Sequence, residues 1–236
     1  MIICFHEILR VCIEMSQTFS FVKSCAKLVK RCNLVAVPRA NGPLTLAFGQ
    51  RASVQGLLQT ADGEPIAGAP VTVGAQPPGW PSQPAGSLST DPQGHFTYQI
   101  APGPSRTITF AFPATSALRG AWATTTVQVA GNATITAGST ARAGHALRLS
   151  GNVLGGYIPP GGTLIQLQYR IVGYPQGWMP FAVLVRTHSN GVWSTTIPLR
   201  RDAAGLTYQF RGVITTQSGW PYTQTTTNLV TRRVLT

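Results

Sequence analysis

The feature that most constrains the fold of this 236-residue chain is a succession of short segments rich in β-branched and aromatic residues, each ended by turn-forming residues. Such segments predict β-strands, and no apolar repeat of helical period follows residue 33. Hydrophobic residues make up 43% of the chain, which excludes a disordered polymer. The predicted strands form two sets: 44–48, 52–58, 69–73, 87–90, 95–100, 106–112 and 122–129, then 133–137, 146–153, 164–171, 181–186, 192–197, 207–214 and 228–234.

The two sets repeat one pattern. Gly94 ends the turn before one strand, and Gly191 does the same 97 positions later, while Gly56 and Gly151 are 95 positions apart. About seven short strands per hundred residues is typical of a β-sandwich, and each unit is long enough to bury its own core. We therefore predict two tandem antiparallel β-sandwiches, at 44–130 and 131–236. So short a linker, near 129–132, favours an elongated pair.

The first 36 residues differ from the rest and are predicted to form a separate N-terminal segment, helical or disordered. All four cysteines and all three lysines lie in residues 1–32, which contain no glycine or proline. Residues 21–32 have the apolar period of a helix. One interpretation is a cationic helix lying on a membrane, and the other is an upstream stretch foreign to the fold. Under the second, residues 1–32 are dispensable, and a protein that begins at Pro38 keeps its stability.

Two motifs carry a family resemblance. The first is V-Q-G at Val54–Gly56 with D-G-E-P-I-A-G-A-P-V at Asp62–Val71, and the second is T-D-P-Q-G-H-F at Thr90–Phe96. Together they resemble carboxypeptidase-regulatory-like domains, which are prealbumin-like sandwiches of bacterial secreted and cell-surface proteins. Residues 206–211 resemble a late strand of an immunoglobulin or fibronectin type III unit. The resemblance implies two tandem immunoglobulin-like sandwiches that serve as spacer, adhesion or display units, and it supplies no catalytic residue.

The charge and the polar residues argue against most chemistries. The net charge is +12, but the fourteen arginines that follow Lys30 are scattered, so nucleic acid is not favoured as a partner. No motif of a hydrolase, metalloenzyme or nucleotide-binding protein occurs, and the four histidines show no metal-ligand spacing. No apolar run is long enough for a membrane-spanning helix. We therefore predict no enzyme activity, no metal and no cofactor.

Aromatic residues in predicted loops are the candidates for binding. Gly-Trp-Pro occurs at Trp80 and at Trp220, where Tyr222 follows, and a near variant surrounds Trp178. Exposed tryptophans stack on sugars or partner proteins, although such residues can equally close the ends of a sandwich. Trp193 and Phe96 follow turns inside strands and are assigned to the cores.

The sequence thus predicts a noncatalytic structural or binding module of a secreted or cell-surface bacterial protein, extracellular or in the cell envelope. The alternative is a carbohydrate-binding accessory module that uses the loop tryptophans. Cell-wall polysaccharide or other envelope proteins are the expected partners. The chain is expected to be monomeric or part of a longer chain.

Overall fold

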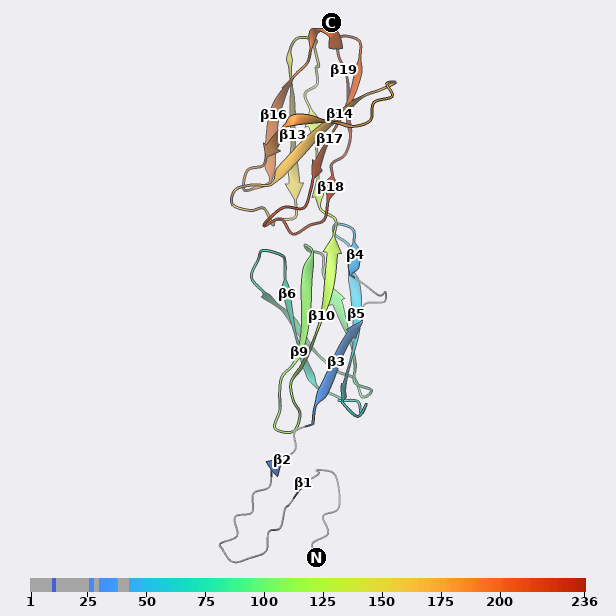
Figure 1. The fold of residues 1–236 in the computed structure, drawn as a ribbon, viewed down its shortest axis with the longest axis vertical. Coiled ribbons are helices and arrows are strands. Elements are labelled where there is room, and N and C mark those ends of the chain that lie inside the picture. Colours follow the sequence, from blue (N-terminus) through green and yellow to red (C-terminus); the bar gives the residue numbers. More distant parts are fainter. Residues whose placement is uncertain (1–9, 12–25, 28–29, 38–42) are drawn as a thin grey trace, which may run out of the picture.

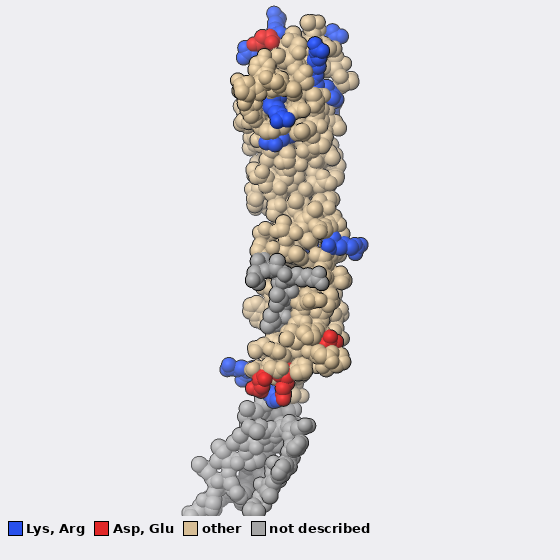
Figure 2. Space-filling view, turned by 90° about the vertical axis from the view of Figure 1, so that its right-hand side faces the viewer, with Lys and Arg blue, Asp and Glu red and all other residues tan. Residues whose placement is uncertain are grey.

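The computed structural model describes residues 10–11, 26–27, 30–37 and 43–236, of which 30–37 and 43–236 form two β-sandwiches arranged end to end (Figure 1). Their common long axis gives the described chain the shape of a rod (Figure 2). The described residues contain no α-helix, and a single turn of 3-10 helix, η1, covers Arg201–Ala203. The fold is therefore all-β, as the strand pattern predicts.

The first sandwich packs a sheet of three strands on a sheet of five. The smaller sheet has the order β3-β5-β8, and the larger has the order β4-β10-β9-β6-β7. All neighbours run antiparallel except β4, which runs parallel to β10. The strands are β3 (Cys32–Val37), β4 (Leu44–Leu46), β5 (Ala52–Thr60), β6 (Pro70–Gln76), β7 (Gln83–Ser89), β8 (His95–Ile100), β9 (Arg106–Phe112) and β10 (Ala121–Val129).

The second sandwich packs a sheet of four strands on a sheet of five. One sheet pairs β13 with β11, β12 and β16, and the other has the order β15-β14-β17-β18, with β19 also on β17. The arrangement of both units is that of an immunoglobulin-like sandwich. The strands are β11 (Asn132–Ala133), β12 (Thr136–Ala137), β13 (Ala146–Leu154), β14 (Leu164–Ile171), β15 (Met179–Arg186), β16 (Val192–Pro198), β17 (Thr207–Ile214), β18 (Thr225–Thr226) and β19 (Val230–Arg233).

The repeated glycines have one structural cause in both units. Gly56 lies opposite Phe96 in the β5–β8 ladder, and Gly151 lies opposite Trp193 in the β13–β16 ladder. A Cβ atom on Gly56 would lie 2.0 Å from the Phe96 ring, and one on Gly151 would lie 2.8 Å from the Trp193 ring and 1.9 Å from the backbone oxygen of Thr134. Each glycine therefore makes room for the large aromatic residue that fills its core, which confirms the assignment of both aromatics to the interior.

The family-like motifs are turn structures. Asp91 Oδ1 accepts hydrogen bonds from the backbone of Gln93 and His95, at 2.9 and 2.8 Å. The buried Thr90 Oγ1 accepts from Ala69 N at 2.9 Å and donates to Ile66 O at 2.6 Å. These residues hold the loop that follows β5 against the turn before β8, so the motifs act in folding and not in chemistry.

The N-terminal prediction is wrong where the structure describes the segment. Residues 26–27 form the short strand β2 (Ala26–Lys27), which pairs with β1 (Arg10–Val11), and residues 32–37 form β3 on the edge of the first sandwich. Leu34 is buried in the core, so β3 belongs to the fold and a protein that begins at Pro38 lacks an intrinsic strand. The rest of the predicted helix over residues 21–32 lies outside the described residues, apart from Lys30 and Arg31, which are not helical either.

Candidate functional sites

The first candidate site is the joint between the sandwiches, where loops of both units meet. Trp80, between β6 and β7, donates a hydrogen bond from Nε1 to Gly219 O at 3.0 Å. Ser105 N donates to Pro221 O at 2.8 Å, and Thr223 N donates to Val129 O at 2.9 Å. Two loops of the first unit and the end of β10 therefore contact one segment of the second, between β17 and β18.

Aromatic side chains fill the space behind these hydrogen bonds. The Trp80 ring meets the edge of Tyr157 at a centroid distance of 5.2 Å, and Tyr222 lies 6.1 Å from Phe48 of the first unit. Trp220 lies 5.4 Å from Tyr222 and so close to the linker that a Cβ on Gly131 would approach its ring to 2.7 Å. Aromatic side chains of both units therefore pack around the linker at the joint.

Tyr222 is fixed inside the second unit as well. Its hydroxyl donates to Gly155 O at 3.0 Å, and the side chain is buried. Burial is the main reason that the pKa of Tyr222 rises to about 12, because the phenolate would lose its hydration.

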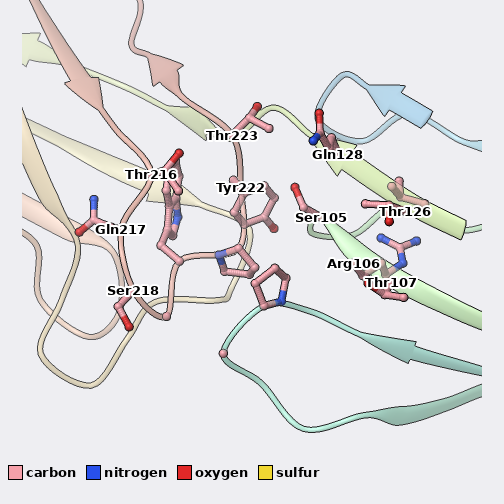
Figure 3. A pocket seen from close by; sticks show the side chains of 16 residues that line it. Ser105, Arg106, Thr107, Thr126, Gln128, Thr216, Gln217, Ser218, Tyr222 and Thr223 are labelled. Atoms are coloured by element: carbon pink, nitrogen blue, oxygen red, sulfur yellow. The ribbon is translucent and has the colours of Figure 1, made fainter. Parts of the chain in front are cut away.

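A groove of about 520 Å³ opens beside the joint (Figure 3). Its lining combines the ends of β9 and β10 with the loop between β17 and β18, and several of its side chains carry hydroxyl or amide groups. The half-buried Arg106 is turned to its own unit, since Nη1 donates to Pro104 O at 2.6 Å. The groove is therefore a recess produced by the joint, with polar groups on a mostly apolar lining.

Three of the four aromatic residues predicted to contact a glycan lie in this joint. Trp220 and Tyr222 are only 2% and 4% exposed, so neither can offer a ring face to a sugar, and their assignment as stacking platforms is wrong. Trp80 is half-buried, with its indole N–H engaged across the joint. The repeated Gly-Trp-Pro triplet therefore marks two surfaces that meet each other.

Trp178 lies elsewhere, on the second sandwich just before β15. The guanidinium carbon of Arg170 lies 4.9 Å from the centre of its ring, and that of Arg211 lies 4.1 Å away. Both distances are within the range of a cation–π interaction. Trp178 thus stays half-exposed, but arginine side chains already stack on it.

The most exposed tryptophan is one that the sequence analysis places in a strand and does not single out. Trp122, on β10, is 72% exposed. The outer face of the same sheet carries an array of threonines, in which Thr124 pairs with Thr109 and Thr126 pairs with Thr107. The sequence does contain a signal for this exposed face. Small polar residues alternate in 107–109 and 122–126, and on a sandwich strand such alternation predicts which side chains face outward.

Other chemistry finds no support in the described part of the chain. No group of three or more histidine, cysteine, aspartate or glutamate side chains is placed there to hold a metal ion. Nor do the described residues include a helix that is long and apolar enough to cross a membrane.

No family model and no curated protein matches the chain. Among solved structures it is similar to a tetra-tandem repeat in the extending region of a large adhesion protein, with 13% identity and a TM-score of 0.45 over 86% of this chain and 49% of that one. It is similar to the D1–D4 ectodomain fragment of ICAM-5 at 13% identity and a TM-score of 0.42, over 86% of this chain and 51% of that one. For trypsin-activated alpha-2-macroglobulin from Escherichia coli the identity is 14% and the TM-score 0.33, over 86% of this chain and 15% of that one. The chain spans about half the length, or less, of these structures.

Proposed function

We propose that this chain is a noncatalytic, rod-like spacer segment of an extracellular or envelope protein, in which two sandwiches are held in line by an interlocked joint. The observation that carries the proposal is the hydrogen bond from Trp80 to Gly219, together with the backbone bonds of Ser105 and Thr223. Domains within a chain move relative to each other by default unless their interface is large and well packed. A spacer needs that motion suppressed, and the motif resemblance of residues 54–73 and 90–96 to prealbumin-like surface domains supports the same role.

The test measures whether the two sandwiches tumble as one body. Backbone ¹⁵N relaxation should give one common rotational diffusion tensor for residues 44–128 and 133–236 in the wild type. Trp80→Ala removes the indole donor and the contact with Tyr157, so we expect separate tensors and a smaller maximum dimension in X-ray scattering. Trp122→Ala is the matched control, since it removes a tryptophan from the same sandwich away from the joint. Independent tumbling of the wild-type sandwiches would reject the spacer role.

A second candidate function is carbohydrate binding, with a site different from the loop tryptophans. The exposed Trp122 and the threonines of β9 and β10 offer a stacking surface beside hydroxyl groups, which suits an uncharged polysaccharide. Thr107, Thr109, Thr124 and Thr126 make no side-chain hydrogen bond to other described residues, so their hydroxyls are free for a ligand.

Intrinsic fluorescence during titration with soluble uncharged polysaccharides tests this candidate. Trp122→Ala should abolish the response, whereas Trp80→Ala should retain it, so the two variants exchange the roles they have in the spacer experiment. A response that survives in Trp122→Ala would remove this face from consideration.

A further inference from the structure

The positive charge of the chain is concentrated in one sandwich. Residues 131–236 contain nine arginines and one acidic residue, Asp202, whereas residues 44–130 contain three basic and three acidic residues. Asp202 is itself engaged, since Arg200 Nε lies 3.1 Å from its carboxylate. Figure 2 shows the same distribution, with blue atoms gathered over the end of the rod that the second sandwich forms. The second sandwich thus has eight arginines without a carboxylate partner among the described residues.

The register of one sheet brings several of these arginines to a single face. In β14 the side chains of Ile165 and Leu167 point into the core, so Arg170 lies on the outer face by alternation. In β17 the buried Phe210 places Arg211 on that same face. The same alternation in β15 and β19 adds Arg186 and Arg233. We call the set Arg170, Arg186, Arg211 and Arg233 the basic face.

Arg170 and Arg211 are held in a fixed arrangement at its centre. Gln168 pairs with Arg211 across the β14–β17 ladder, and Arg170 pairs with Gln209. Arg170 Nε donates to Gln209 Oε1 at 2.7 Å, and Arg211 Nε donates to Gln168 Oε1 at 2.8 Å. The glutamines orient both guanidinium groups without neutralising them, and none of the terminal Nη atoms donates to a described residue.

Both guanidinium groups lie against the ring of Trp178. Because both guanidinium carbons stack on its ring, they lie no more than about 9 Å apart, the sum of their distances from the ring centre. Burial, followed by the charge of Arg170, lowers the pKa of Arg211, which is the direction expected for two like charges without a counter-ion. An anion at this position would relieve that repulsion and accept hydrogen bonds from both forks.

We propose that the basic face binds an acidic polysaccharide, with Arg170 and Arg211 clasping one carboxylate or sulfate group and Arg186 and Arg233 contacting neighbouring groups of the same chain. Arginine suits this task because its planar fork matches a carboxylate or sulfate group. A nucleic acid is less well served, since single strands bind through bases stacked on aromatic rings, and Trp178 is already covered by guanidinium groups. The inference goes beyond the spacer role and does not depend on it.

The test uses the full chain with four probes: dextran sulfate, polygalacturonate, uncharged dextran and a single-stranded oligothymidylate. We expect binding to dextran sulfate or polygalacturonate, weakening with salt, and none to dextran; the first two probes distinguish a sulfate from a carboxylate ligand. Each substitution removes charge-assisted hydrogen bonds to the anion, which are stronger than neutral ones. The double variant Arg170→Gln/Arg211→Gln should therefore raise the dissociation constant by roughly tenfold or more.

Two control variants separate a site from bulk charge. Arg142→Gln/Arg148→Gln removes the same charge from exposed positions in a loop and on the opposite sheet, so its dissociation constant should change by less than the site variant's. Arg170→Lys/Arg211→Lys keeps the charge but removes the planar guanidinium fork, so it should also weaken binding. This variant provides the test if the Gln variant fails to fold. Three outcomes would overturn the proposal. They are equal losses of affinity in the two Gln variants, tighter binding of oligothymidylate than of both acidic polysaccharides, and no binding of either acidic polysaccharide. None of these outcomes bears on the tumbling of the two sandwiches, so the spacer role is tested separately.

Discussion

Replacing Trp193 by alanine should remove most of the stability of the second sandwich. The side chain is fully buried at the centre of that core, facing the space that Gly151 leaves. A buried tryptophan removes about 150–250 Å² from water, which corresponds to roughly 4–6 kcal/mol at about 25 cal/mol per Å². That figure is an upper bound because unfolded chains already bury some of this surface. We therefore expect a loss of about 3–5 kcal/mol, the range typical of such substitutions.

Differential scanning calorimetry measures this loss. At about 4–8 °C per kcal/mol for a domain of this size, Trp193→Ala should lower the transition of the second sandwich by more than roughly 10 °C. Phe96→Ala should act in the same way on the first sandwich, and Trp122→Ala should leave both transitions nearly unchanged because its ring is in solvent. Trp193→Phe should cost less than alanine, because it keeps a ring and removes a buried Nε1–H that has no acceptor among the described residues. A Trp193→Ala protein within about 1 kcal/mol of wild type would mean that the β13–β16 register is wrong.

Three further predictions concern the first sandwich, the joint and alkaline stability. A protein that begins at Lys30 should unfold at the same temperature as the full chain. One that begins at Pro38 lacks β3 and the buried Leu34, so its free energy of unfolding should fall by at least about 2 kcal/mol. Equal unfolding midpoints of the two proteins would show that β3 is not needed. Gly131→Ala should cost about 1–3 kcal/mol and loosen the joint, since its Cβ would lie 2.5 Å from Thr225 Oγ1; an unchanged relaxation tensor would contradict this. Because the folded state raises the pKa of Tyr222 to about 12, the unfolded chain releases its proton first, near pH 10, and stability should fall between about pH 10 and 12. Tyr222→Phe should have a shallower alkaline fall in denaturant titrations, and an identical fall would exclude Tyr222 as its cause.

Most of the fold could be predicted because the strand signals are local. The alternation of residues 106–112 and the turn at Asn190 and Gly191 depend on neighbours in sequence, and the observed bounds of β9 agree with the predicted ones. β3 was missed for the opposite reason. Residues 1–36 were assigned to one separate segment because their composition differs from the rest, and β3 gains its strand partner only through the distant β5. An edge strand at a change of composition is thus recognised only from its tertiary pairing.

The candidate sites were harder to predict because they join distant residues. The repeated Gly-Trp-Pro triplet singled out Trp80 and Trp220, but the hydrogen bond that explains the triplet joins positions 139 residues apart. The composition of these loops is the same for a sugar platform and for a domain joint. Only the arrangement of the two sandwiches separates the two interpretations. The alternation of inward and outward side chains along β10 is enough to identify Trp122 as an exposed candidate for binding.

The joint also bears on how binding at the two exposed faces would combine. The hydroxyl-rich face with Trp122 belongs to the nearly neutral first sandwich, and the basic face belongs to the second. If the joint keeps the sandwiches in line, a long polysaccharide with charged and uncharged stretches meets both faces in one fixed geometry, and the second contact gains from a high effective concentration. Loosening the joint by Trp80→Ala would then leave binding of short oligosaccharides unchanged and weaken binding of long ones, because only the long ligands depend on the relative placement of the faces.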